Sequence, residues 1–148
     1  MYREGNRNVW TLESTYRVTH ATLQAVPVQI AYARGYFDAE GGLPQDPWAR
    51  FYIQLVQKDR TDIENLHALL AALGIRCGVL HNPSSVDPDY WRFYILASSQ
   101  VDFISRIGSW HPRKRRLLEI RRAMARVHSS VGRKRSAVRV PAVGIVTS

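Results

Sequence analysis

The sequence predicts an α+β domain in which helices cover one face of a four-stranded antiparallel sheet. Two segments carry apolar residues at helical spacing, and each is followed by two stretches in which apolar and polar residues alternate. The order is therefore helix, two strands, helix, two strands and further helices. With 148 residues, of which 45% are hydrophobic, the chain is long enough for one domain with a substantial core.

The helices are predicted from apolar periodicity and from the residues that stop it. The first covers residues 27–39 and the second covers residues 61–73, and glycine follows soon after each of them. Thr61 is expected to cap the second helix, because Glu64 three positions later completes a capping box. Two further helices are predicted, over residues 100–107 and 112–127.

Four strands are predicted from alternating side chains, over residues 42–46, 48–58, 75–80 and 90–95. In the second strand, Phe51, Ile53 and Leu55 share one face, and the fourth strand repeats this pattern from Trp91 to Ile95. Turn residues separate the members of each pair. The four strands are thus expected to form two hairpins of one antiparallel sheet.

The face of this sheet that points away from the helices combines arginine, amide and aromatic side chains, with no glutamate. Its predicted members are Trp48, Arg50, Tyr52, Gln54, Arg76, Tyr90, Arg92 and Tyr94. An ordinary solvated sheet face is one interpretation. The other is a surface for the DNA major groove, where arginine and glutamine read guanine and adenine by paired hydrogen bonds.

Charge is distributed unevenly along the chain. The 21 Lys and Arg and 12 Asp and Glu give a net charge of +9. Residues 1–110 hold 10 basic and 11 acidic side chains, whereas residues 111–148 hold 11 basic side chains and a single acidic one. Such a block attracts polyanions, so nucleic acid is the first expected partner and an acidic membrane surface is the second.

Several classes of protein do not fit the composition. Cys77 is the only cysteine, so neither an internal disulfide nor a cysteine zinc cluster can form. The five histidines lack metal-site spacing, and no apolar run is long enough to span a membrane. We expect a soluble protein without a membrane partner, in the cytoplasm or nucleoid of a prokaryote or in an organelle.

The chain is expected to have three parts. Residues 1–20 are polar and are predicted to form an N-terminal arm, and residues 21–128 form the folded domain. Residues 129–148 are predicted to be a basic, flexible tail.

One stretch at the end of the first helix resembles a known motif. Residues 33–41 read Ala-Arg-Gly-Tyr-Phe-Asp-Ala-Glu-Gly, which is similar to the LAGLIDADG motif of the homing endonucleases. Ala33 replaces leucine, and Arg34 stands where a small residue is usual. The order of elements over residues 27–127 is also that of the family. The resemblance implies an αββαββα fold whose sheet forms a DNA-binding saddle.

The motif also has a physical logic. Ala31, Gly35 and Ala39 repeat every four residues and leave a stripe on which a second helix can pack closely. One copy of the motif is present, and single-motif members act as homodimers on nearly palindromic targets. The expected dimer interface consists of Ala31, Gly35, Asp38 and Ala39.

The resemblance assigns catalytic roles. Glu40 would lie beside its counterpart in the partner, and a magnesium ion (Mg²⁺) between them, also bound by the Ala39 carbonyl, would relieve the repulsion. Gln57 falls where the family has a residue that orients the attacking water. A basic residue near the scissile phosphate is expected at Lys114, which we favour, or Arg113, although this basic stretch could instead contact only phosphates or solvent.

The resulting hypothesis is an Mg²⁺-dependent endonuclease that makes a site-specific double-strand break in double-stranded DNA. One alternative on the same fold is an intron RNA-splicing maturase, which would bind RNA, or a DNA-binding regulator that does not cut. Glu40 and Gln57 favour the nuclease, because a pure binder needs no metal-bound acid. A basic RNA-associated structural protein would explain the tail but not the motif.

Overall fold

The computed structural model of the chain describes residues 2–4, 7–9, 23–46 and 48–136. The strands are β1 (Tyr2–Glu4), β2 (Arg7–Val9), β3 (Gly41–Gly42), β4 (Gln54–Gln57) and β5 (Trp91–Tyr94). The helices are α1 (Val26–Glu40), α2 (Arg60–Ala72), η1 (Ala97–Ser99), α3 (Gln100–Asp102), the π-helical η2 (Phe103–Ile107) and α4 (Pro112–Ser136). Among the described residues, no helix is both long and apolar enough to cross a membrane.

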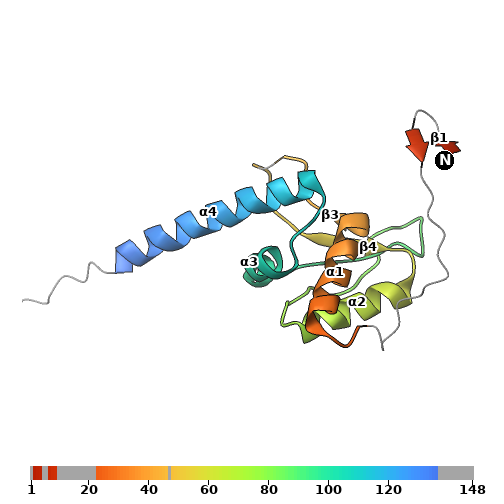
Figure 1. The fold of residues 1–148 in the computed structure, drawn as a ribbon, viewed down its shortest axis with the longest axis horizontal. Helices are drawn as coiled ribbons and strands as arrows, with labels where there is room; N and C mark the ends of the chain where they lie inside the picture. Colours follow the sequence, from red (N-terminus) through yellow and green to blue (C-terminus); the bar gives the residue numbers. More distant parts are fainter. Residues whose placement is uncertain (1, 5–6, 10–22, 47, 137–148) are drawn as a thin grey trace, which may run out of the picture.

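The main sheet is antiparallel, with strand order β3-β4-β5, and α1 and α2 pack against it (Figure 1). Leu55 of β4 pairs with Gly41 on one side and Phe93 on the other. Both Leu55 and Phe93 are buried, together with Ile53 and Ile95, as the alternation predicted. The core between this face and the helices includes Phe37, Ile63, Leu66, Leu70, Phe103, Ile107 and Leu118. The class is therefore α+β.

The strand predicted at residues 75–80 does not form, so the main sheet of the described residues has three strands and not the predicted four. This segment pairs with the β5 side only through two isolated bridges, Cys77 with Ile95 and His81 with Arg92. From one bridge to the next there are four residue steps along this segment, from Cys77 to His81, but three along its partner, from Ile95 to Arg92. The extra residue is a β-bulge, which interrupts the ladder and turns the following side chains to the other face.

The predicted strand at residues 48–58 is also too long, because only Gln54–Gln57 is a strand. The Asp46 carboxylate accepts a hydrogen bond from the Trp48 backbone N–H at 2.9 Å, and the Asp46 carbonyl accepts one from Ala49 at 3.2 Å. These bonds make a turn and remove two backbone donors from any ladder. The predicted partner strand at residues 42–46 is accordingly reduced to Gly41–Gly42.

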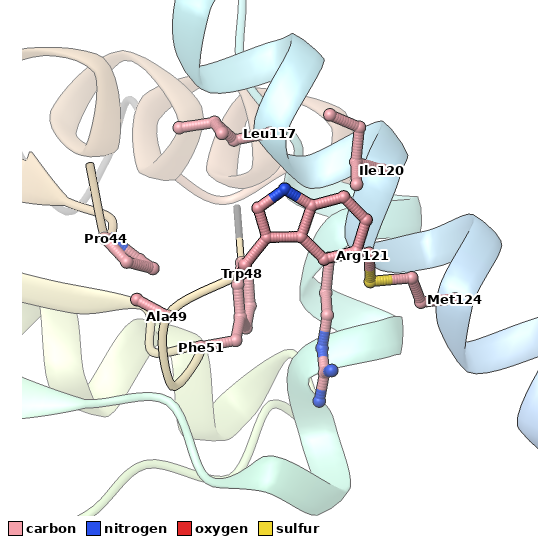
Figure 2. Close-up of a pocket in the computed structure, with 8 residues that line it drawn as sticks. All are labelled: Pro44, Trp48, Ala49, Phe51, Leu117, Ile120, Arg121 and Met124. Carbon is pink, nitrogen blue, oxygen red and sulfur yellow. The ribbon is translucent and has the colours of Figure 1, made fainter. Parts of the chain in front are cut away.

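The loop that replaces the longer strand lies against α4. Pro44, Trp48 and Phe51 face Leu117 and Met124 across an apolar pocket of about 370 Å³ (Figure 2). Arg121 also lines this pocket, and its guanidinium lies 5.0 Å from the centre of the Phe51 ring. The loop is thereby supported by the helix and not by strand pairing.

Two helix ends differ from the prediction. The N-cap of α2 is Asp59 and not Thr61, and the Asp59 side chain accepts from the Asp62 backbone N–H at 3.1 Å. Glu64 forms an ion pair with Arg60 at 2.7 Å and does not complete a capping box with Thr61. The predicted helix over residues 112–127 continues to Ser136 and extends past the rest of the domain (Figure 1). The backbone of residues 129–136, predicted as flexible tail, is therefore helical. Residues 1, 5–6 and 10–20 of the predicted arm and 137–148 of the tail lie outside the described residues.

We predict that Gly41→Ala strongly destabilises the fold. A Cβ at Gly41 would overlap the ring and the carbonyl oxygen of Phe37, at the point where α1 turns directly into β3. The expected loss of unfolding free energy is about 1–3 kcal/mol or more, measured by urea denaturation. Gly78→Ala is the matched control: the nearest atom to its Cβ is the Tyr94 oxygen at 3.5 Å, so the change should stay within about 0.5 kcal/mol. Equal effects of the two variants would contradict this account of the turn.

Candidate active site and sheet surface

The C-terminal end of α1 is held by Lys114 from the first turn of α4. The ammonium donates to the carbonyls of Phe37 at 2.7 Å and Asp38 at 2.9 Å, and it lies 4.9 Å from the centre of the Phe37 ring. The Phe37 carbonyl also accepts from the Gly41 backbone N–H, and the negative end of the helix dipole makes a cation at this place favourable. Burial lowers the pKa of Lys114, an effect that the carboxylates of Asp38 and Glu40 oppose.

Asp38 fixes the loop that leads into α4. Its carboxylate accepts hydrogen bonds from the Ser109 hydroxyl and, at 2.9 Å, from the Trp110 backbone N–H. Ser109 Oγ in turn accepts from the His111 backbone N–H at 3.1 Å. The Asp38 side chain, predicted at a dimer interface, is therefore engaged within its own chain.

Glu40 lies at the exposed end of the motif helix. The next residue, Gly41, pairs with Leu55, two residues before Gln57, so Glu40 and Gln57 lie toward the same end of β4. Burial raises the pKa of Tyr36 to about 12, and the nearby Gln57 side chain opposes this shift. Among the described residues, the Tyr36 hydroxyl has no hydrogen-bond partner. Glu40 is the last residue of α1, and Lys114 binds the carbonyls of Phe37 and Asp38 in the same turn.

The donors at this end suit a hard divalent cation shared with other oxygen ligands. Within the described part of the chain, no three His, Cys, Asp or Glu side chains gather to hold an ion. One exposed carboxylate, Glu40, with the adjacent Ala39 carbonyl, is a partial ligand set. Mg²⁺ commonly binds through one or two carboxylates plus water and phosphate oxygen, so these residues fit a metal completed by a substrate and a second chain.

Arg34, the main departure from the motif, binds within its own chain. Its Nε donates to the Ile107 carbonyl, and Nη2 lies 3.4 Å from the Arg106 carbonyl. The guanidinium also lies 4.8 Å from the Trp110 ring centre. Arg34 therefore ties α1 to the end of η2, a role that the sequence did not reveal because its partners are about 70 residues away.

The small-residue stripe of α1 is uncovered in the described part of the structure. Ala31 and Ala39 are exposed, and a Cβ built on Gly35 meets no atom within 4 Å. The room that a second helix would need is therefore present along this face of α1.

The outer face of the sheet brings together four of the predicted DNA-binding residues. Gln54 pairs with Tyr94 across β4 and β5, and Arg92 follows on the same face. Tyr52 contacts the Tyr94 ring edge-on at 6.1 Å, and the Arg92 guanidinium lies 5.3 Å from the same ring. Arginine, amide and aromatic groups are thus contiguous on this face.

His81, which is not among the residues predicted to face outward, joins this cluster. Its Nδ1 lies 3.0 Å from the Val79 carbonyl and its Nε2 lies 3.4 Å from Arg92 Nε. A carbonyl can only accept and an arginine N–H can only donate, so this arrangement requires neutral His81 with its proton on Nδ1. Simple alternation from Cys77 places His81 on the core face. The bulge reverses that orientation, and no sequence signal marked it.

The other four predicted residues lie off the β4–β5 ladder. Trp48, which is 81% exposed, belongs to the loop beside α4 (Figure 2). Arg50 is exposed and precedes the first residue of β4 by four positions. Tyr90 ends the turn-rich segment before β5. Arg76 is exposed near the start of the bulged edge, where its backbone N–H donates to Ser99 Oγ at 3.0 Å. Whether these four residues contact DNA stays a prediction.

Comparison with known proteins gives similarity in structure only. No family model and no curated protein matches the sequence. One similar structure is I-DmoI in complex with DNA and Mn, with 22% identity and a TM-score of 0.49 over 62% of this chain and 48% of that chain. Another comes from mesophilic variants of the homing endonuclease I-DmoI, with 20% identity and a TM-score of 0.48 over 60% of this chain and 45% of that chain. The chain spans about half the length of these solved chains.

We predict that Lys114→Met destabilises the protein whereas Arg113→Met does not. The first variant leaves the Phe37 and Asp38 carbonyls without their charged donor, which should cost about 1–3 kcal/mol of unfolding free energy. Arg113 is exposed and makes no hydrogen bond or ion pair within the described residues, so its replacement should change stability by less than about 0.5 kcal/mol. Thermal and urea unfolding of both variants decide this. An unchanged stability of the Lys114→Met protein would contradict the stabilising role of Lys114 at the end of α1.

Proposed function

We propose that this protein is a single-motif member of the LAGLIDADG family, a homodimeric homing endonuclease that makes a double-strand break in a long, nearly palindromic DNA target. One observation carries the proposal. Glu40 stands exposed at the end of the motif helix, where Lys114 binds the neighbouring carbonyls and β3 begins its pairing with the strand that ends at Gln57. The small-residue face of the same helix is open to a second copy.

In this proposal a second copy packs on the open stripe and brings its own Glu40 beside the first. The two carboxylates and the Ala39 carbonyls would hold Mg²⁺, which supplies polarisation of the phosphate and activation of water when it is bound. Gln57 orients the attacking water. Lys114, held at the same helix end, or the neighbouring Arg113 stabilises the negative charge that develops on the phosphate.

The outer sheet face is proposed to read the target. Arg92 and Gln54 carry the side chains that recognise guanine and adenine edges in the major groove, and Tyr52 and Tyr94 restrict the space around them. Two-fold symmetry assigns one half of the target to each subunit, with a footprint of about two helical turns.

We predict that Glu40→Gln abolishes strand cleavage but preserves DNA binding. The substitution keeps the size of the side chain and removes the charge that would hold the metal, while the sheet face is untouched. Nicking and double-strand cleavage are measured with Mg²⁺ on the target, and affinity is measured by gel shift with Ca²⁺. Glu64→Gln is the matched control, because Glu64 is an exposed acid on α2 whose only described ion pair is to Arg60, and it should cleave like the wild type.

Two results would count against the nuclease. Cleavage at the wild-type rate by Glu40→Gln would exclude the proposed metal site. Tight, specific binding by the wild-type chain without cleavage would favour the regulator or, if the preferred ligand is intron RNA, the maturase. Asp38→Asn adds a further test, since Asp38 holds the loop before α4 and its loss should lower stability as well as activity.

We predict that Gly35→Leu disrupts the dimer. A leucine side chain would fill the space that the partner helix needs, at a cost of about 1–3 kcal/mol or more. Sedimentation equilibrium should show a dimer for the wild type at micromolar concentration and a weaker or absent dimer for the variant. Ala68→Leu adds similar bulk to an exposed position of α2 and should leave the dimer intact. A monomeric wild-type chain would overturn this part of the proposal.

A further inference from the structure

A second polar pocket lies between the helices, away from the outer sheet face. It has a volume of about 200 Å³ and lies among α1, η2, the loop after η2 and the first half of α4. Its polar lining consists of Arg34, Ser105, Ser109, Arg115, Glu119 and Arg122. Three arginines therefore line one small cavity, from two helices that are far apart in sequence.

The positive charge around this pocket is only partly balanced. Glu119 is its only acidic lining residue, and Arg115 Nε lies 3.8 Å from the Glu119 carboxylate in a pair whose side chains are 66% and 69% exposed. Arg122 has no hydrogen bond or ion pair to any residue that the structure describes. The three arginines outnumber the carboxylates of Glu119 and of Asp38, which accepts a hydrogen bond from the lining residue Ser109, and an anion in the pocket would balance the remaining positive charge.

The arginines also continue beyond the pocket. Arg115, Arg122 and Arg126 are separated by seven and four residues, which places them on one face of α4. Arg126 is exposed and does not line the pocket. The pocket is thus one end of a row of guanidinium groups, a spacing that suits successive charges of a polyanion more than an isolated anion.

We propose that this pocket is a phosphate-binding site, separate from the active site, which takes one phosphate group with Arg122 and Arg115 as the main donors. Guanidinium forks match phosphate oxygens in geometry and charge, and the Ser105 hydroxyl adds a neutral donor. The expected source is the backbone of a nucleic acid that runs along the arginine row of α4. The site does not rest on the proposed cleavage activity and would bind phosphate in a protein that cuts nothing.

The test is an NMR titration of the full chain with inorganic phosphate, which follows the arginine Nε–H signals against sodium chloride at equal ionic strength. Saturable shifts are expected for Arg34, Arg115 and Arg122. Arg122→Gln should raise the apparent Kd for phosphate about tenfold, the effect of losing one charge-assisted contact. Arg116→Gln is the matched control: Arg116 is exposed on the same helix outside the pocket, and its loss should change the Kd less than about twofold.

A second arm identifies the source of the phosphate. If a short duplex displaces the bound phosphate, the site serves a nucleic acid backbone; if phosphate stays bound, the site serves a small phosphate compound, and the binding chemistry stands in either case. Shifts that rise linearly without saturation, or equal losses in the Arg122→Gln and Arg116→Gln proteins, would overturn the site. Glu40→Gln should bind phosphate like the wild type, so failure of the active-site proposal is seen separately.

Discussion

The arrangement of the domain depends on how the C-terminal end of α1 is tied to the rest of the chain. Gly41 lets the helix pass into β3 without a connecting loop, because no side chain fits beside Phe37 at that point. Lys114 then adds a positive charge and hydrogen bonds at the carbonyls of Phe37 and Asp38, the first of which also accepts from the Gly41 backbone N–H. Helix, sheet and α4 therefore meet at one place, and the residues that carry the proposed chemistry are the neighbours of that junction.

The same junction separates two carboxylates with different roles. Asp38 and Glu40 are two positions apart on a helix, which turns their side chains to nearly opposite sides. The Asp38 carboxylate accepts hydrogen bonds from Ser109 and Trp110, and these bonds hold the loop before α4. Glu40 is left exposed at the helix end. Asp38 thus has a structural role, whereas the Glu40 carboxylate makes no such contact with any residue that the structure describes and stays accessible to solvent.

Two local irregularities shape the outer sheet face. The turn at Asp46 takes Trp48 off the sheet and onto the loop beside α4, and the bulge after Gly78 brings His81 onto the sheet surface. His81 then holds Arg92, whose guanidinium also lies over Tyr94. The set of side chains on this face therefore differs from the set that strict alternation predicts.

By itself the sequence determined the two main helices, the inward faces of β4 and β5, and the clustering of small and acidic residues at the end of α1. These features depend on spacing between near neighbours, which a period of 3.6 or 2 records directly. It did not determine the partners of Lys114 and Arg34, the bulge before His81 or the start of β4 at Gln54 instead of residue 48. Those features depend on atoms brought together from segments up to 77 residues apart, and on competition between side-chain and ladder hydrogen bonds that only the folded chain decides.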